Sequence, residues 1–208
     1  MNEPILSVVC FEHKGPIERK IYKMALTPEN LKMFWEKCKK FKRLFNKETV
    51  TTFQDFVALF VSQNGDKYEA NGLFWVVDDF VGVLYLTDIT TGLDGIAHFT
   101  FFDRRVYGRA PLLRALIKHA FDTYGLRRIS AEAPEYLGPR VLEFIKEIGF
   151  KQEGVKRRGA YYNGQFHHKI LYGILPEQLA ATMPQSVVEV TEVKEQLEEM
   201  ASDNGNGN

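Results

Sequence analysis

Residues 96–120 read IAHFTFFDRRVYGRAPLLRALIKHA, and this stretch decides the fold. Residues 96–102 predict a strand, whereas residues 109–124 repeat apolar side chains at helical spacing and predict a helix. The loop between them, residues 105–110, fits the pattern Arg/Gln-x-x-Gly-x-Gly/Ala. A helix N-terminus presents unpaired N–H groups and a partial positive charge, and a glycine lets the backbone approach a phosphate closely. The stretch therefore predicts a strand–loop–helix unit that could bind a pyrophosphate.

Residues around this loop support anion binding. Ala110 is small enough to avoid crowding, and Pro111 can begin a helix without wasting a donor. An aspartate in place of Gly108 would add a side chain and a negative charge, and we expect it to abolish anion binding without disturbing the fold. The six-residue pattern is common, so a basic loop before an amphipathic helix is the alternative. Counter-charge is available from Arg104, Arg105, Arg109 and Arg114.

The segments on either side extend this unit into an α+β order. A closing hairpin is predicted around Asn163-Gly164, a dipeptide typical of tight hairpin turns. Antiparallel strands that lead into one strand–helix–strand crossover are typical of an α+β fold. The predicted elements are hairpin strands at 73–77 and 81–87, a strand at 128–133, a helix at 138–148, and hairpin strands at 151–162 and 166–175.

The part before residue 72 is expected to be mainly helical. Residues 5–11 form an apolar run that indicates a short strand or an arm. Helix starts are predicted at Thr27-Pro28 and at Thr52, and we expect the second helix to end at Asn64-Gly65. Aromatic side chains recur along both helices. They indicate a core face, with a hydrophobic pocket for a substrate as the alternative.

Composition bounds the remaining possibilities. The 208 residues suit one domain, and Lys plus Arg equal Asp plus Glu at 27 each, which disfavours a dedicated nucleic-acid binder. The two cysteines make no metal-binding spacing, so we expect no metal site and a reducing, cytoplasmic environment. No apolar run is long enough to cross a membrane and no signal peptide is recognisable, so no membrane association is expected.

The composition changes near residue 176. Residues 180–208 contain six acidic residues and one basic residue. We expect one domain over residues 1–175, with a variable N-terminal part up to residue 71 and a core over 72–175, followed by an acidic tail at 176–208. A segment with so little apolar surface is expected to be solvated, and a short partner-binding helix within it is the alternative.

The core resembles the GNAT (Gcn5-related N-acetyltransferase) superfamily, most closely the ribosomal-protein alanine N-acetyltransferase-like branch. Besides the loop at 105–110, residues 126–159, LRRISAEAPEYLGPRVLEFIKEIGFKQEGVKRRG, resemble the family's fifth strand, fourth helix and following Gly-Phe-x-x-Glu-Gly segment. Residues 162–172 resemble its closing hairpin. The resemblance implies a GNAT fold of class α+β, in which a mixed, mostly antiparallel sheet contains a central splayed parallel strand pair and is flanked by helices.

The resemblance also implies a cofactor, acetyl-coenzyme A (acetyl-CoA), and an amine that accepts the acetyl group. The core over 72–175 would bind this cofactor, with its pantetheine arm between the strands at 96–102 and 128–133. The pyrophosphate would lie on the backbone amides of residues 107–110. The residues that the family pattern assigns to cofactor binding are Phe102, Arg104, Arg105, Tyr107, Gly108, Arg109 and Ala110.

Three residues near the splayed strands are candidates for proton transfer. His98 has an ordinary pKa of about 6.5, which suits a general base, and a hydrogen-bonded structural histidine is the alternative. Glu132 on the opposite strand could act as a base through water, or form a structural salt bridge. Tyr136 could protonate the departing thiolate, or be an ordinary loop tyrosine.

Two positions depart from the family pattern. The family often has an asparagine where this chain reads Leu137-Gly138-Pro139, and many members have a tyrosine where this chain has Ile145. Two functions therefore fit the sequence. The first is an N-acetyltransferase that acts on an amine of a protein or small molecule. The second is a binding or assembly subunit with the same fold, in which the C-terminal tail or the N-terminal helices bind a protein partner or a second copy of the chain.

Overall fold

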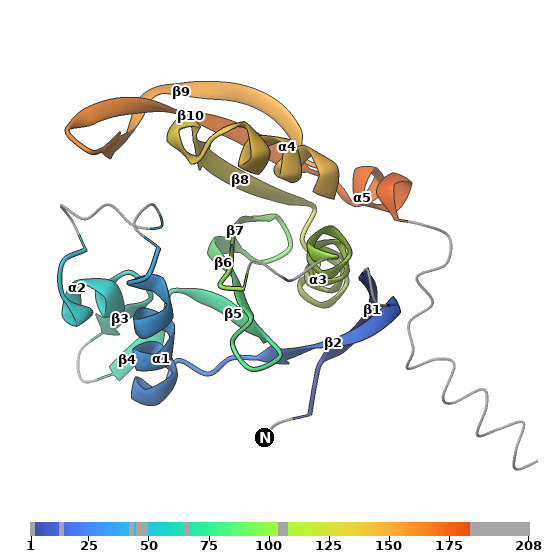
Figure 1. The fold of residues 1–208 in the computed structure, drawn as a ribbon, viewed down its shortest axis with the longest axis horizontal. Helices are drawn as coiled ribbons and strands as arrows, with labels where there is room; N and C mark the ends of the chain where they lie inside the picture. The colour runs from blue at the N-terminus through green and yellow to red at the C-terminus, as the bar shows by residue number, and fades with distance from the viewer. Residues whose placement is uncertain are drawn as a thin grey trace, which may run out of the picture.

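The structure has an α+β architecture built on one large mixed sheet. The computed structural model describes residues 3–12, 15–41, 44, 50–64, 67–103 and 108–183. Within these ranges the sheet has eight strands in the order β1-β2-β5-β6-β7-β8-β10-β9 (Figure 1). They are β1 (Leu6–Glu12), β2 (Gly15–Lys23), β5 (Gly72–Val77), β6 (Gly82–Thr90), β7 (Asp94–Phe101), β8 (Arg128–Pro134), β9 (Lys151–Tyr162) and β10 (Gln165–Ile174).

Helices and a small hairpin complete the fold. The α-helices in the described residues are α1 (Pro28–Cys38), α2 (Phe53–Ala58), α3 (Arg109–Tyr124), α4 (Pro139–Ile148) and α5 (Pro176–Thr182), and a 3-10 helix, η1, spans Glu135–Leu137. Strands β3 (Val61–Asn64) and β4 (Lys67–Ala70) form the hairpin. None of the helices that the structure describes is long and apolar enough to cross a membrane.

The parallel pair β7–β8 lies at the centre of the sheet. The other strand pairs that the structure describes are antiparallel. A parallel pair needs a crossover, which α3 supplies. Pairing runs from Asp94↔Arg128 to Ile96↔Ser130, and among the described residues it goes no further. Since both strands continue past this point, to Phe101 and Pro134, they separate. The predicted splayed parallel pair is confirmed.

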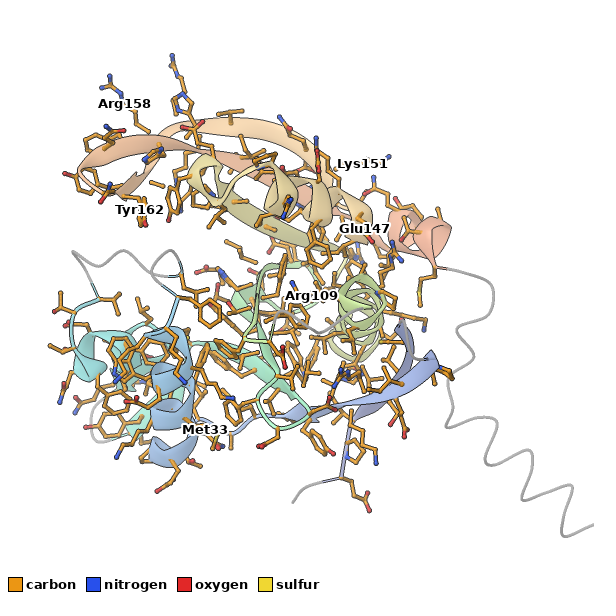
Figure 2. All side chains as sticks on the ribbon, viewed as in Figure 1. Met33, Arg109, Glu147, Lys151, Arg158 and Tyr162 are labelled. Atoms are coloured by element: carbon orange, nitrogen blue, oxygen red, sulfur yellow. The ribbon has the colours of Figure 1, made fainter. Side chains whose placement is uncertain are left out.

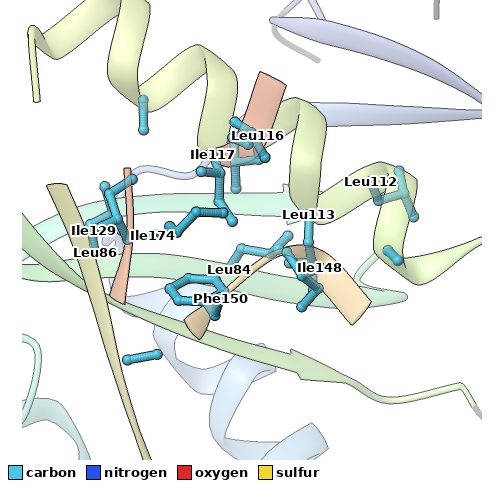
Figure 3. Close-up of a cluster of buried hydrophobic side chains, with 14 of the residues drawn as sticks. Leu84, Leu86, Leu112, Leu113, Leu116, Ile117, Ile129, Ile148, Phe150 and Ile174 are labelled. Atoms are coloured by element: carbon cyan, nitrogen blue, oxygen red, sulfur yellow. The ribbon is translucent and has the colours of Figure 1, made fainter. Parts of the chain in front are cut away.

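Both faces of the sheet are buried, by different helices. In Figure 1, α3 lies on one side of β5 and β6, and α1 and α2 lie on the other side. Strand β5 shows the division, because Trp75 and Val77 belong to the core on the α3 side, whereas Phe74 and Val76 belong to the core on the α1–α2 side. Figure 3 shows the α3 side, where leucines and isoleucines of α3 pack on the sheet. A strand that is buried on both faces gives an unbroken apolar run, here LFWVV.

The N-terminal part contains more strand than the sequence predicted. Helix α2 begins at the expected Thr52 cap but ends at Ala58, and β3 and β4 follow it. The prediction that this helix ends at Asn64-Gly65 is therefore wrong. An Asn-Gly pair serves a helix end or a hairpin turn equally well, and here strands flank it. The apolar run at 5–11 is strand β1, and β2, which was not predicted, connects it to β5.

Candidate functional site

The N-terminus of α3 lies at the expected anion-binding loop. Residues 104–107 fall outside the described residues, so the roles of Arg104, Arg105 and Tyr107 stay predictions. Gly108 precedes the helix in a left-handed conformation, with φ 69° and ψ 26°, and it has no side chain that could cap the first N–H groups. Ala110 is buried in the helix's first turn. The described part of the loop thus places two small residues, Gly108 and Ala110, at a helix N-terminus without a side-chain cap, as phosphate binding requires.

Gly108 also has a packing role that the sequence did not indicate. A Cβ atom built on Gly108 would lie 2.6 Å from Cβ of Cys10, which is buried on β1. The Sγ atom of Cys10 lies 3.5 Å from the Gly108 carbonyl oxygen and donates a weak hydrogen bond to it. An aspartate at this position would therefore strain the backbone and displace β1. The expectation that such a substitution leaves the fold undisturbed is wrong.

Arg109 joins the helix end to the end of β7. Figure 2 labels Arg109 beside α3. Its Nη2 atom donates a hydrogen bond of 3.0 Å to the carbonyl oxygen of Asp103, and its guanidinium lies 5.3 Å from the ring centre of Phe101. Burial lowers the pKa of Arg109, and the nearby Asp103 opposes this shift. The side chain holds the two ends of the loop at 104–107 together, and its contact with a cofactor stays a prediction.

Phe102 faces the helical half of the molecule. Its ring centre lies 6.1 Å from that of Phe34 and 5.7 Å from that of Phe41. Its backbone N–H donates to the carbonyl oxygen of Val81, so this amide is already satisfied. The neighbouring Phe101 packs toward the α3 side. A part for Phe102 in cofactor binding stays a prediction.

A cavity of about 1230 Å³ lies on the α1–α2 side of the splayed strands. Its wall brings together parts of the chain that are distant in sequence: the end of α2, the bulged end of β6, alternate residues of β7 and β8, and the β9–β10 hairpin. Its polar and aromatic lining residues include Tyr85, Thr87, Asp88, His98, Glu132, Tyr136, Tyr161 and Lys169. All three residues predicted for proton transfer therefore line one cavity.

His98 is held from two sides. Its ring stacks on Tyr85, with ring centres 4.6 Å apart and an interplanar angle of 10°, and its Nε2 atom lies 2.9 Å from Oγ1 of Thr87. Burial lowers the pKa of His98 from the ordinary 6.5, Asp88 and Glu132 oppose the shift, and Lys169 adds to it. The imidazole is therefore neutral near neutral pH and can accept a proton.

The hydrogen bonds of Thr87 select the tautomer of His98. Thr87 Oγ1 donates to Oδ2 of Asp88 at 3.2 Å, and a hydroxyl has one proton to give. Both contacts of Thr87 are satisfied together when Nε2 of His98 carries the ring proton and donates it to Oγ1. In this arrangement Nδ1 of His98 has the free lone pair and is the basic atom.

Glu132 forms the salt bridge that was one of its two predicted roles. Its Oε2 atom lies 2.8 Å from Nζ of Lys169, on the neighbouring strand β10. The hydrogen bond from Lys169 is the largest cause that lowers the pKa of Glu132, and burial opposes it. The lowered pKa keeps Glu132 ionised, so in this structure it acts as the partner of Lys169.

Tyr136 lies where η1 follows β8 and packs against the closing hairpin. Its ring stacks on Tyr162 at 4.5 Å and meets His167 edge-on at 5.2 Å. Burial is the main cause that raises the pKa of Tyr136, and Tyr162 adds to it. Its hydroxyl therefore stays protonated at neutral pH and is able to donate a proton.

Sequence reasoning missed Thr87, Asp88 and Lys169. Asp88 occurs at a β-bulge, where the β6–β7 register shifts between Thr87↔Ile96 and Thr90↔Asp94. The local sequence of residues 82–90 contains no pattern that predicts a bulge. The alternation of side chains along β10 could have placed Lys169 on one face of that strand. Its partner Glu132 on β8 is 37 residues away in the sequence, so no local pattern could pair the two.

Comparisons with known proteins give a fold but no family. No protein-family model matches the chain, and no curated protein sequence matches it significantly. Among solved structures, a spermidine N-acetyltransferase chimera from Vibrio cholerae and hSSAT aligns with a TM-score of 0.61 at 16% identity, over 77% of this chain and 98% of that chain.

Two further structures agree with this result. The Vibrio cholerae spermidine N-acetyltransferase in complex with CoA and spermine aligns with a TM-score of 0.56 at 18% identity, over 77% of this chain and 98% of that chain. A probable acetyltransferase aligns with a TM-score of 0.55 at 19% identity, over 77% and 94%. The chain therefore has the fold of these acetyltransferases.

Proposed function

We propose that this chain is an N-acetyltransferase that uses acetyl-CoA and acts on an amine of a protein or small molecule. One observation carries the proposal. The parallel strands β7 and β8 separate after Ile96↔Ser130, and the cavity that contains His98 lies on the separated part. The shared fold with solved acetyltransferases, one of which is in complex with CoA and spermine, supports it.

The described residues fit the cofactor. Acetyl-CoA supplies an acetyl group that is activated as a thioester. At the start of α3, Gly108 supplies no side-chain cap and Ala110 is small, and the carbonyl and N–H groups of the separated strands β7 and β8 offer partners for an extended amide-containing arm. We assign the pyrophosphate to the amides of residues 107–110, with Arg104 and Arg105 as counter-charge.

The side chains of the cavity supply the proton transfers. His98 accepts a proton from the incoming ammonium at Nδ1, while Thr87 holds Nε2 and fixes the ring. Tyr136, which stays protonated, donates to the departing thiolate. Glu132 is held by Lys169 and contributes its negative charge near His98.

A binding or assembly subunit is the second candidate. Ile145 stands where many members of the resembled family have a tyrosine, and it is buried in the core, so this position supplies no acid. The finer assignment, to the ribosomal-protein alanine N-acetyltransferase-like branch, rests on residues 126–159 and 162–172. Membership of that branch would favour an amino group of a protein as the acceptor.

Calorimetry followed by turnover separates the two candidates. We expect acetyl-CoA to bind one-to-one, in the range of about 1 µM to 1 mM that is ordinary for enzyme substrates. With an accepted amine, free thiol should then appear. His98→Ala should lower turnover by roughly 100-fold or more with acetyl-CoA affinity retained, since general-base catalysis typically contributes that much.

His119→Ala is the matched control, because His119 bonds Thr123 on α3 and is not among the cavity-lining residues. Full turnover in His98→Ala would assign the base elsewhere. Acetyl-CoA binding without thiol release from any amine would favour the binding subunit, and no acetyl-CoA binding would refute the proposed cofactor.

A further inference from the structure

The described part of the cavity wall carries one carboxylate that no basic side chain neutralises. Of the two acids in this wall, Glu132 is paired with Lys169 at 2.8 Å. Asp88 accepts a hydrogen bond from the neutral hydroxyl of Thr87. His98 is neutral near neutral pH, because burial lowers its pKa. The described lining therefore has a surplus of one negative charge, at Asp88.

The backbone of β6 is shaped to present Asp88 at this wall. Two residues of β6, at positions 88 and 89, lie opposite Gly95 of β7, which makes a bulge. Asp88 has φ 49°, a left-handed value that side chains other than glycine adopt at a cost in energy. A bulge re-aims the side chains that it carries, and here both Asp88 and Ile89 line the cavity.

Apolar and aromatic side chains line about half of the wall, beside polar groups such as Asn71 and Thr91. Tyr85, Tyr136 and Tyr161 contribute rings, and Leu59, which is 43% exposed, contributes an apolar side chain. Additional apolar lining comes from Leu44, Phe60, Leu73, Ile89 and Ile96. Such a wall accepts an apolar body and the faces of aromatic rings, but it would leave a second or third ammonium without a counter-charge.

From the charge at Asp88 and the apolar and aromatic lining we infer that the acceptor is a primary amine with one positive charge, whose remaining part is apolar and preferably aromatic. Asp88 binds its ammonium group. The inference rests on the proposed N-acetyltransferase function and narrows its substrate class. It disfavours polyamines, the acceptors named for the structurally similar spermidine N-acetyltransferases. Asp88 and His98 both contact Thr87 Oγ1, within 3.2 Å, so an ammonium held by Asp88 lies on the side of the cavity where the base is.

Calorimetry with three small molecules tests the inference without requiring turnover. The probes are 2-phenylethylamine, spermidine and the uncharged 2-phenylethanol, each titrated into the full chain with CoA present. We expect 2-phenylethylamine to bind about fivefold more tightly than either of the others, because an ion pair at an exposed carboxylate such as Asp88 is worth up to about this factor. If spermidine binds as tightly as 2-phenylethylamine or more tightly, the acceptor is not restricted to amines with one positive charge. If 2-phenylethanol binds as tightly as 2-phenylethylamine, Asp88 does not bind the ammonium group.

Asp88→Asn removes the charge while its amide oxygen can still accept the Thr87 hydrogen bond. This variant should lower the affinity for 2-phenylethylamine about fivefold and leave the affinity for 2-phenylethanol unchanged. Asp122→Asn is the control, since Asp122 is an exposed residue of α3 that pairs with Lys118. Unchanged 2-phenylethylamine affinity in Asp88→Asn would refute the assigned site.

Different experimental results would contradict the inferred acceptor and the proposed function. A protein that binds 2-phenylethylamine through Asp88 but binds no acetyl-CoA would contradict the N-acetyltransferase and leave the amine site standing. A protein that acetylates spermidine in preference to 2-phenylethylamine would retain the enzyme and contradict the inferred acceptor.

Discussion

At the scale of single residues, both the backbone conformation and the close packing at position 108 require glycine. Its φ of 69° favours glycine, and a Cβ atom there would collide with Cβ of Cys10 at 2.6 Å. Gly164 is a matched comparison, because it has φ 79° but nothing within 4 Å of an added Cβ. We expect Gly164→Ala to cost about 1–2 kcal/mol from backbone strain alone, and Gly108→Ala about 2–5 kcal/mol from strain plus overpacking. Urea unfolding of both variants measures the difference, and equal losses would show that Cys10 moves aside freely.

The pKa of His98 makes a second prediction at this scale. Because burial lowers this pKa in the folded protein, the unfolded chain binds more protons as the pH falls below the ordinary value of 6.5. The contribution of neutral His98 to stability is therefore present above that pH and is lost as the pH falls through the window below it. Wild type should lose more unfolding free energy than His98→Gln between about pH 7.5 and about pH 5.5, measured by urea unfolding. A larger loss in the variant would contradict the sign of the shift.

At the scale of elements, α5 is part of the packed domain. Leu179 is 2% exposed, and Oγ1 of Thr182 donates a hydrogen bond of 2.8 Å to the carbonyl oxygen of Leu179 and lies 3.4 Å from that of Ile148. A chain that ends after Leu175 should lose about 5–10 °C in Tm, because removing one buried leucine costs about 2–5 kcal/mol. A chain that ends after Met183 is the control and should stay within about 2 °C of wild type, since the acidic stretch offers little apolar surface.

That second truncation also tests the predicted partner role of the tail. Residues 184–208, which hold all six acidic residues counted from residue 180, lie outside the described residues. Light scattering of the full chain and the chain ending at Met183 compares their molecular masses. A full-length oligomer that becomes a monomer on truncation would support assembly through the tail, and identical masses would count against it.

At the scale of the whole molecule, one sheet joins two cores. Trp75, 1% exposed, belongs to the core on the α3 side, whereas Trp35 packs on Phe56 in the core on the α1–α2 side. Because β5 contributes alternate residues to both, we expect the two cores to unfold together. In Trp35→Phe and in Trp75→Phe, the midpoint from the remaining tryptophan's fluorescence should equal the midpoint from circular dichroism. Distinct midpoints within one variant would show that the α1–α2 side unfolds separately.

The sequence by itself determined the elements of the core and their order. Strand and helix periods, the Thr52 cap and the Asn163-Gly164 turn are local features, and a strand–helix–strand segment of this length predicts a parallel pair. These signals work because neighbouring residues set backbone preferences directly. They failed where one dipeptide is compatible with two structures, as at Asn64-Gly65, and where a strand with a polar sequence, such as β2, is formed mainly through its partners.

Only the tertiary structure decided the chemistry of the site. His98, Glu132 and Tyr136 were predicted as residues, but their states come from partners that no local pattern specifies: Thr87 and Tyr85 on β6 for His98, Lys169 on β10 for Glu132, and the closing hairpin for Tyr136. The bulge at Asp88 and the point at which β7 leaves β8 follow from register across strands. Register is set by which faces become buried when the whole sheet packs, so it is a property of the folded molecule and not of any one segment.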